Sequence, residues 1–435
     1  MKTGLRALVL ALLLVAVFGF AAMAAEYVGS ETCRSCHSDT YADWQGTWHS
    51  KHVVKPDSGL FYGDFRTNKW FKKEDVKYAV GNSRKQYYVA KDNSYLPAYW
   101  DGEAGKWVEL KLPSKWDSAC AKCHTTGFDA KTAKFAELNI TCESCHGPGS
   151  DHVAGGGDKT KIKKDLTNAT CNQCHGQGAQ LEQMGHTTHF ANMLATNDHY
   201  NDSCMSCHSA TYIFAPKDAK PTVKDFKTGA LKNDRTGITC VVCHDPHKKA
   251  NEAQLRKDPQ ETCVQCHTSG GQVAAGKDPH HGQKEIFEGN IGFGVAATPS
   301  AKTARCVDCH MANGNHFFKV GTPELKLTEH GKEITVNSCS KCHSNMTAER
   351  IKDIQTKVQT QVKTLRGRLD AVKAKLEAAK KSGKDVAAIE QLYKEAYTNV
   401  GWIDAGKGEG IHNTDLVFKL LKAADERLAR AEAQF

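Results

Sequence analysis

The sequence has no cysteine outside a closely spaced pair, few prolines, few aromatic residues, and no long apolar run beyond residue 22. Proline occurs 11 times in 435 residues, and aromatic residues make up 8% of the chain. A membrane-spanning helix needs about 20 consecutive apolar residues, so the sequence predicts no span after residue 22. Apolar residues reach only 40%, which predicts a folded protein whose own side chains supply a modest core.

The N-terminus carries the pattern of an export signal. Lys2 and Arg6 precede the apolar residues 7–22, and the small residues that follow fit a cleavage site. We expect residues 1–25 to be a signal peptide that is removed, which predicts a periplasmic or secreted bacterial protein with no stable membrane span after cleavage. An uncleaved membrane anchor is the alternative, although the run is short for one.

All 18 cysteines fall into nine Cys-x-x-Cys pairs, and a histidine follows each pair directly. The paired cysteines are Cys33 and Cys36, Cys120 and Cys123, Cys142 and Cys145, Cys171 and Cys174, Cys204 and Cys207, Cys240 and Cys243, Cys263 and Cys266, Cys306 and Cys309, and Cys339 and Cys342. The histidines that follow them are His37, His124, His146, His175, His208, His244, His267, His310 and His343. So many cysteines in an exported protein would ordinarily indicate disulfides, and zinc sites also use Cys-x-x-Cys. Neither requires a histidine after every pair, so we reject both interpretations.

This motif is typical of covalent haem attachment. Each cysteine can add to one vinyl group of a haem, and the following imidazole then binds the iron as its proximal ligand. The sequence therefore predicts nine covalently attached c-type haems. The formal charge of +9 is then expected to offset the haem propionates rather than to bind nucleic acid.

A second histidine on the opposite side of each iron would complete a bis-histidine haem. Twelve histidines lie outside the motifs, and we expect seven to nine of them to bind iron. The candidates are His49, His52, His152, His186, His189, His199, His247, His281, His316, His330 and His412, of which the first two are expected on a helix just after the first motif. The alternative ligands are Met184, Met193, Met205, Met311 and Met346, which would raise the reduction potential. The excess of histidine predicts mostly low-potential haems.

Most motifs follow one another closely, which leaves little chain to build a core around each haem. We therefore expect a mainly α fold with few strands. In it, packed haems, short helices and loops form a nonahaem cytochrome c domain over residues 26–345. The long interval between Cys36 and Cys120 is the exception.

This long interval predicts a small β insertion near residues 60–116. Strands are expected near residues 86–90, 95–100 and 106–112, where aromatic and β-branched residues gather between turn signals. The tryptophans of the insertion pack either on a haem or in a small core of their own. A substrate platform is the alternative.

Residues 346–435 form a second predicted domain, which is helical. Apolar residues from Ile351 to Leu376 recur at intervals of three and four, the spacing of an amphipathic helix with a near-heptad stripe. We expect this helix to end at Ser382-Gly383, a second to span about 386–400, and a third to start after Thr414 as its N-cap. These helices would form a long-helix hairpin that packs on the haem domain or, as we favour, a homodimer interface.

Several segments are similar to bacterial periplasmic multihaem electron-transfer cytochromes. They are Tyr27-Val-Gly-Ser-Glu-Thr-Cys33, Trp44-x-x-Thr47-x-His49, Trp116-Asp-Ser-Ala-Cys120, and Ile140-Thr-Cys142 with the downstream Gly-Pro-Gly-Ser-Asp-His152. The resemblance implies that His49 and His152 are distal ligands.

The C-terminal part resembles cytochrome c nitrite reductase, which belongs to one superfamily with hydroxylamine oxidoreductase. Cys306-Val-Asp-Cys-His-Met311 with the downstream His316 is similar to a late haem motif and its distal histidine, and Gly410-Ile-His412-Asn is similar to a C-terminal histidine ligand. The resemblance also implies that the C-terminal helices dimerise. The chain departs from the reductase in having no Cys-x-x-Cys-Lys motif and no clear match for its active-site arginine, and in having nine motifs in place of five or eight.

These observations favour electron transfer through mostly bis-histidine haems in periplasmic or other extracytoplasmic anaerobic respiration. The expected redox partners are a quinol-oxidising donor and a terminal reductase or other cytochromes. The sequence leaves open an oxidoreductase, a haem-based reductase of nitrite, hydroxylamine or a sulfur oxyanion with one open iron. Its candidate catalytic residues are His280, His281 and Tyr212, which would deliver protons. A third possibility is an extracellular conducting filament of stacked chains.

Overall fold

The computed structural model describes residues 25–111, 115–300, 303–322, 326–329, 332–335 and 337–435. Apart from Ala25, the expected signal peptide therefore lies outside the described residues. The chain divides into two compact units. The first reaches to Cys174 and includes Asp245–Lys249, and the second comprises His175–His244 and Ala250–Phe435. The division into a haem domain over 26–345 and a helical domain over 346–435 stays a prediction.

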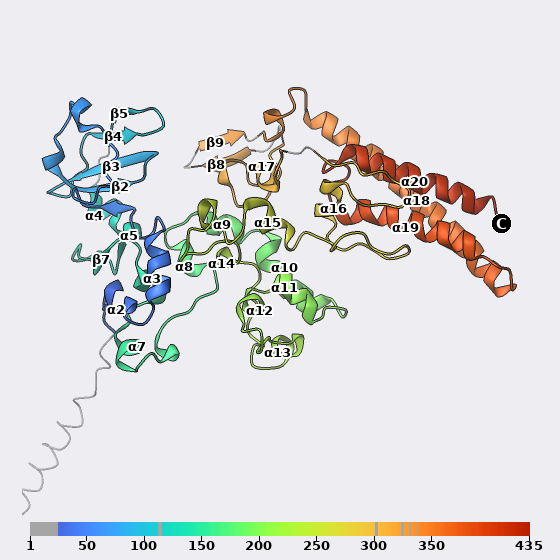
Figure 1. Ribbon diagram of the computed structural model, residues 1–435, viewed down its shortest axis with the longest axis horizontal. Helices are drawn as coiled ribbons and strands as arrows, with labels where there is room; N and C mark the ends of the chain where they lie inside the picture. Colours follow the sequence, from blue (N-terminus) through green and yellow to red (C-terminus); the bar gives the residue numbers. More distant parts are fainter. Residues whose placement is uncertain (1–24, 112–114, 301–302, 323–325, 330–331, 336) are drawn as a thin grey trace, which may run out of the picture. The chain divides into compact units, whose positions relative to one another are not determined.

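The first unit contains a five-stranded antiparallel sheet in the order β1-β2-β3-β4-β5 (Figure 1). The strands are β1 (Val53–Val54), β2 (Val76–Gly81), β3 (Lys85–Ala90), β4 (Ala98–Asp101) and β5 (Lys106–Glu109). The last two form a hairpin in which Asp101 lies opposite Lys106, and the Asp101 carboxylate accepts two main-chain N–H bonds of the turn. The predicted β insertion is thus confirmed. β2 is a further strand within residues 60–116, and β1 extends the sheet beyond them towards the N-terminus.

The two faces of this sheet pack against different parts of the first unit. On one face Tyr88 and Trp107 form an aromatic core with two phenylalanines, with ring centroids 5.2 to 6.1 Å apart. The opposite face covers Trp116 and Ala121, which are almost fully buried. The Trp116 ring also lies 5.8 Å from His124 of the second motif. The tryptophans therefore occupy both predicted places, a small core and the surroundings of a motif.

Short helices and turns make up the rest of the first unit. They are α2 (Ser30–Arg34), α3 (Ser38–Gln45), α4 (Trp116–Ala119), α5 (Ala121–His124), α6 (Cys142–His146), α7 (Ser150–Ala154), α8 (Ala169–Asn172), the 3-10 helices η1 (Phe65–Thr67), η2 (Lys73–Asp75) and η3 (Lys159–Lys161), and the hairpin of β6 (Thr125–Thr126) with β7 (Glu137–Leu138). Because α3 ends at Gln45 and Gly46 follows it, the prediction that His49 and His52 lie on this helix is wrong. Both follow it in a turn.

The second unit begins with short helices that alternate with loops. They are α9 (Gln177–Leu181), α10 (Gly185–Thr196), η4 (Asp202–Cys204), α11 (Met205–His208), α12 (Ala210–Phe214), α13 (Val223–Lys227), α14 (Cys240–Cys243), η5 (Glu252–Gln254), α15 (Pro259–Val264), α16 (Gln283–Glu288), α17 (Cys306–His310), η6 (Ala312–Gly314) and η7 (Cys339–Lys341), with the hairpin of β8 (Lys326–Glu329) and β9 (Lys332–Thr335). This arrangement matches the expected mainly α fold with few strands.

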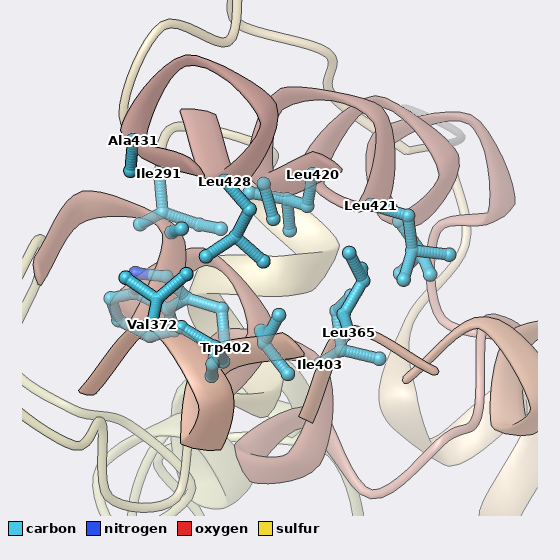
Figure 2. Close-up of a cluster of buried hydrophobic side chains, with 14 of the residues drawn as sticks. Ile291, Leu365, Val372, Trp402, Ile403, Leu420, Leu421, Leu428 and Ala431 are labelled. Carbon is cyan, nitrogen blue, oxygen red and sulfur yellow. The ribbon is translucent and has the colours of Figure 1, made fainter. Parts of the chain in front are cut away.

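Three long helices end the second unit: α18 (Ala348–Lys381), α19 (Ala387–Gly406) and α20 (Thr414–Glu432). The hairpin of α18 and α19 is completed by α20, and side chains of all three helices interdigitate in one core that includes Leu365, Trp402 and Leu420 (Figure 2). The helix breaks fall close to the predicted ones. The N-cap of α20 is Asn413 rather than Thr414, because the Asn413 side chain accepts the Leu416 N–H at 3.1 Å.

The apolar stripe of α18 is buried within this core. Its buried members are Val358, Leu365, Leu369, Val372 and Leu376. The stripe therefore packs on α19 and α20 of the same chain, and the homodimer stays a prediction. Among the described residues, none of the helices is both long and apolar enough to cross a membrane.

Candidate haem-attachment sites

Each Cys-x-x-Cys-His motif lies on, or directly beside, a short helical turn. In such a turn positions i and i+3 lie on one side, so the two thiols of a motif point the same way. The His37 N–H donates to the carbonyl of Cys33 at 2.9 Å, and the sixth, seventh and ninth motifs repeat this bond at 2.8, 3.0 and 2.8 Å. None of the 18 cysteines, all of which lie in the part of the chain that the structure describes, forms a disulfide. Each motif thus presents two thiols and one imidazole together, the donor set that a c-type haem requires.

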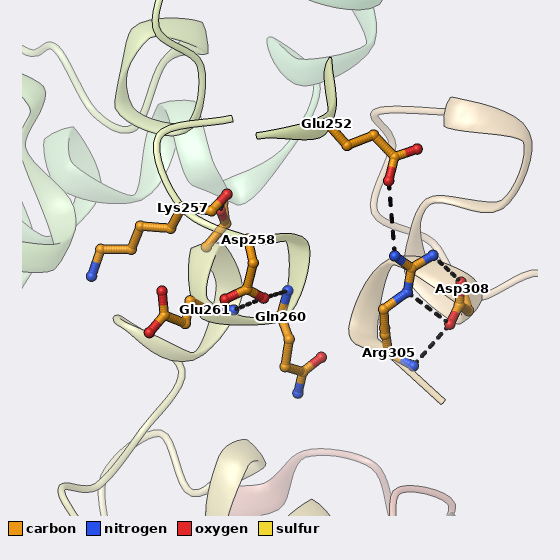
Figure 3. Close-up of polar contacts among 8 residues, drawn as sticks. Glu252, Lys257, Asp258, Gln260, Glu261, Arg305 and Asp308 are labelled. Carbon is orange, nitrogen blue, oxygen red and sulfur yellow. Dashed lines mark hydrogen bonds and ion pairs between the residues drawn. The ribbon is translucent and has the colours of Figure 1, made fainter. Parts of the chain in front are cut away.

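Polar side chains fix the start of two of these turns (Figure 3). Asp258 caps α15, which carries the seventh motif, by accepting two main-chain N–H bonds at 2.8 and 3.1 Å. The Gln260 side chain then accepts the N–H of Cys306 at 2.9 Å. Arg305, directly before the eighth motif, pairs with Asp308 at 3.1 Å. These contacts hold the seventh and eighth motifs against each other.

Histidines outside the motifs lie opposite motif histidines. Two imidazoles bound to one metal from opposite sides, with metal–nitrogen bonds of about 2 Å, have ring centroids about 6 Å apart. The pairs with this spacing include His37–His152 at 6.4 Å, His146–His247 at 6.0 Å, His244–His316 at 6.1 Å, His310–His412 at 6.1 Å and His267–His186 at 6.0 Å. The residues present therefore fit a haem iron held between two histidines.

In two of these pairs, the Nδ1 atom of each histidine lies within hydrogen-bond distance of a main-chain carbonyl oxygen. His244 and His316 contact carbonyl oxygens at 2.8 and 3.0 Å, and His310 and His412 do so at 3.0 and 2.9 Å. In the first unit, His146 and His152, which belong to different pairs, each have a main-chain carbonyl oxygen at Nδ1 as well. A hydrogen bond at Nδ1 fixes the tautomer and leaves Nε2 for a metal, as is common among metal-binding histidines.

The second, fourth and ninth motif histidines have other surroundings. His124 stacks on His52 with ring centroids 4.7 Å apart. His175 lies close enough to the sixth-motif histidine for their charges to interact. His343 is exposed, and the nearby candidate His330 lies outside the described residues.

Two further candidate ligands, His49 and His199, lie in turns. His49 is half-buried, and its carbonyl accepts the N–H of Ile140 at 3.0 Å. His199 is exposed, and its N–H donates to the Asn197 side chain at 2.9 Å. Both therefore stay candidate ligands.

The fifth and seventh motif histidines share a crowded set of partners. His208 has His189 at 4.9 Å and His281 at 5.8 Å between ring centroids, and His281 also lies 6.0 Å from His267. His280 is exposed, and its ring lies 4.0 Å from that of His281. Burial and the neighbouring histidines lower the pKa of His281 to about 4, so its imidazole is neutral near pH 7.

Tyr200, rather than the predicted Tyr212, lies beside these histidines. Tyr212 packs on a hydrophobic cluster, with the Lys220 ammonium 5.0 Å from its ring centroid. Tyr200 instead lies with its ring 6.1 Å from that of His208, and its buried hydroxyl has no hydrogen-bond partner among the described residues. Tyr200 lies four residues before Cys204 of the fifth motif, but nothing in the sequence distinguishes it from the other tyrosines near motifs, so sequence reasoning misses it.

Two buried glutamates, which sequence reasoning also misses, form hydrogen bonds with the chain beside motifs. Glu143, at a variable position of the third motif, is 2% exposed and accepts three main-chain N–H bonds at 2.7 to 2.9 Å. Glu285 accepts the Thr268 hydroxyl at 2.6 Å and N–H groups of the loop after the seventh motif. A lone glutamate usually lies at the surface, so only the fold reveals these roles.

Cysteines of different motifs contact each other within each unit. The pairs whose thiols are close enough to interact are Cys33–Cys142, Cys123–Cys174, Cys207–Cys266 and Cys263–Cys306. The bond from Cys266 lowers the pKa of Cys207 to about 6. Since each thiol is an attachment point for a haem vinyl group, neighbouring motifs present adjacent attachment points.

Three family models match parts of the chain. The model for cytochrome c552 matches residues 280–435, the model for a doubled CXXCH motif matches residues 233–272, and the model for cytochrome c554 and c-prime matches residues 88–147. The matches fall on both the early and the late motifs, as the resemblances in the sequence predict.

Solved structures and a curated relative agree with these matches. The undecahaem cytochrome from the S-layer of Carboxydothermus ferrireducens is 30% identical with a TM-score of 0.78, and the alignment covers 95% of this chain and 71% of that one. The outer cell wall cytochrome OcwA is 29% identical with a TM-score of 0.76, covering 92% and 99%. The multihaem cytochrome MtrA of Shewanella baltica (strain OS185) is 25% identical over 281 residues, which are 55% of this chain and 80% of that protein. The octahaem sulfite reductase MccA of Wolinella succinogenes, at 13% identity and a TM-score of 0.55 over 94% and 84% of the two chains, shares the fold.

With Cys-x-x-Cys-His motifs that present haem-attaching thiols and an imidazole together, and with these relatives, the chain belongs to the multihaem c-type cytochromes.

Proposed function

We propose that this chain is a nonahaem cytochrome that passes electrons from a donor protein to an acceptor in extracytoplasmic respiration. The observation that carries the proposal is the contact between cysteines of different motifs. Electron transfer between cofactors falls steeply with the distance between their edges, and the thioether bonds lie at the haem edge. Cysteines in contact would therefore hold neighbouring haems edge to edge.

These contacts also order the motifs within each unit. In the first unit Cys33 contacts Cys142, Cys174 contacts Cys123, and Cys145 and Cys171 are close enough for their charges to interact. These links connect the first, third, fourth and second motifs in that order. In the second unit the seventh motif lies next to the fifth, sixth and eighth, and the eighth lies next to the ninth. The path of electrons would therefore differ from the order of the sequence, with the seventh motif as a junction.

The histidine pairs supply the axial ligands in this proposal. When bound, each haem supplies an iron that takes up and releases one electron. The proposed distal ligands, from the first motif onwards, are His152, His52 and His247 for the first three, His316 for the sixth, His186 for the seventh and His412 for the eighth. His49, His199 and His330 remain candidates for the fourth and ninth.

Intact mass spectrometry of the holoprotein tests the haem count. A mass that exceeds the processed polypeptide by nine haems is the expected result, and a smaller number would show that some motifs stay empty. Ferric EPR of the same sample should show almost only low-spin iron, because two imidazoles give a strong ligand field.

The partners and the location are part of the same proposal. The S-layer and outer cell wall named for the two similar structures support an exported protein, in agreement with the predicted signal peptide. Its redox partners would be a quinol-oxidising donor and a terminal reductase or other cytochromes. A homodimer through the C-terminal helices would have to use faces outside the stripe that α19 and α20 cover, and sedimentation at micromolar concentration tests for it.

Reduction of nitrite, hydroxylamine or a sulfur oxyanion is the second candidate function. The observation in its favour is the site around His208, where His281 and the buried, unpartnered hydroxyl of Tyr200 could deliver protons. EPR with added nitrite separates the two functions. A high-spin signal that nitrite changes would favour the reductase, and low-spin signals that nitrite leaves unchanged would favour the electron carrier.

A further inference from the structure

Three histidines compete for two motif histidines in the second unit. His186, His189 and His281 all lie within ligand range of the fifth or the seventh motif. Two irons with proximal histidines need two distal ligands. One of the three is therefore in excess, or one iron has two alternative ligands.

The seventh motif already has a ligand of its own. His186 lies 6.0 Å from His267 between ring centroids, as expected for two imidazoles on one metal. It is fixed on α10, and its carbonyl accepts the N–H of Ile238 at 2.8 Å. The competition is therefore between His189 and His281, and it concerns His208 of the fifth motif.

Both competing histidines face His208 in similar ways. Their rings are tilted by 38° and 37° from the His208 ring, at 4.9 and 5.8 Å. They are also close enough to each other for their charges to interact. His189 comes from α10 and His281 from the turn before α16, so two independent segments bring an imidazole to the same place.

The turn that carries His281 is held in a strained conformation. The φ angle of His281 is +53°, in the left-handed region that residues with a side chain seldom adopt. The preceding His280 N–H donates to the Ser269 hydroxyl at 2.7 Å. Gly282 packs so closely on the Trp402 ring that an added Cβ would lie 2.9 Å from it. The surrounding residues thus hold His281 at this position despite its unfavourable backbone.

We infer that the haem iron of the fifth motif has two alternative distal histidines, His189 and His281, and that each can replace the other. The inference rests on the proposed haem at this motif and goes beyond it, because it assigns two alternative distal histidines to one iron. Exchange between the two would keep the iron six-coordinate while its ligand changes from a helix to a strained turn. The motif lies next to the seventh, the junction of the unit, so the exchange would act on a side branch of the electron path.

Single and double substitutions test the exchange by ferric EPR, with high-spin iron counted in equivalents per protein. His189→Ala and His281→Ala should each leave the iron low-spin, and the double variant should show one high-spin equivalent that added imidazole returns to low-spin. His316→Ala, which removes the single partner proposed for His244, is the positive control and should show one equivalent by itself. His280→Ala is the negative control, since the His280 ring is exposed and lies against the His281 ring rather than opposite a motif histidine.

Two outcomes would overturn the inference. A full high-spin equivalent in either single variant would show that only that histidine binds, and a double variant without high-spin iron would show that neither does. Haem counting by mass on each variant separates these results from failure of the proposed function. Loss of the haem itself would lower the mass, whereas loss of a ligand would leave it unchanged.

Discussion

Replacing Glu143 by glutamine would test whether one buried carboxylate holds the N-terminal segment on the third motif. One carboxylate oxygen accepts the N–H groups of Val28 and Gly149 at 2.9 and 2.7 Å, and the other accepts that of Gly29 at 2.8 Å. Glu143 is 2% exposed, so water cannot replace these bonds. The chain before the first motif and the chain after the third therefore depend on a single side chain.

The expected loss follows from the number of acceptors. Glutamine has one acceptor oxygen, so its NH₂ group must face at least one main-chain N–H. The two main-chain hydrogen bonds that remain would have a neutral acceptor instead of a charged one, and each would weaken by about 1 kcal/mol. The third N–H would be buried without a partner, which costs about 2 kcal/mol. The total of about 4 kcal/mol corresponds to a fall in melting temperature of roughly 8–16 °C for a unit of this size.

Hydrogen exchange on the holoprotein gives the local measurement. Because about 1.4 kcal/mol corresponds to about tenfold, the peptides that contain Val28, Gly29 and Gly149 should exchange several hundredfold faster in Glu143→Gln. Glu26→Gln is the matched control, since Glu26 lies in the same segment and is exposed. Unchanged exchange of these peptides in Glu143→Gln would refute the argument that the buried charge anchors the segment.

Three further substitutions test separate parts of the structure. Leu369→Ala, in the buried stripe of α18, should lower the stability of the C-terminal helices by about 2–5 kcal/mol and leave sedimentation unchanged; altered sedimentation at constant melting temperature would show that the stripe joins two chains. His412→Ala should give one high-spin ferric equivalent in EPR and His280→Ala none, and equal spectra would remove His412 from the ligands. Hydrogen bonds and charge from two lysines lower the pKa of Glu390 from 4.5 to about 2. The contribution of Glu390 to stability is therefore present above pH 4.5 and lost as the pH falls through about 2. Glu390→Gln should flatten the pH dependence of the melting temperature in that window. An unchanged slope would contradict the two ion pairs.

Regular, local patterns made much of the fold predictable. The three-and-four spacing of α18 continues for several turns, and Ser382-Gly383 ends it where the structure does. The second helix runs further than predicted, to Gly406, because Trp402 and Ile403 continue its buried face. The strand β1 has two residues, too few for a sequence pattern, so only its pairing with β2 identifies it.

In the candidate site, too, the residues that are consecutive in the chain were predictable and those brought together by tertiary structure were not. The two thiols and the imidazole of a motif are consecutive in the chain, so the sequence alone names them. A distal histidine comes from elsewhere, as His152 does for His37 and His412 for His310, and tertiary structure alone brings the two together. Tyr200 lies only eight residues before His208 in the chain, and the packing of its cluster brings its ring to that histidine.

The contact between cysteines of different motifs has a consequence for how the protein is made. A chain that compacted before receiving its haems would hold Cys33 against Cys142 and Cys263 against Cys306. In an oxidising compartment such thiols can join as disulfides, and each wrong bond would consume one attachment point from two haems at once. In the proposed exported protein, haem attachment would therefore have to precede compaction of the chain.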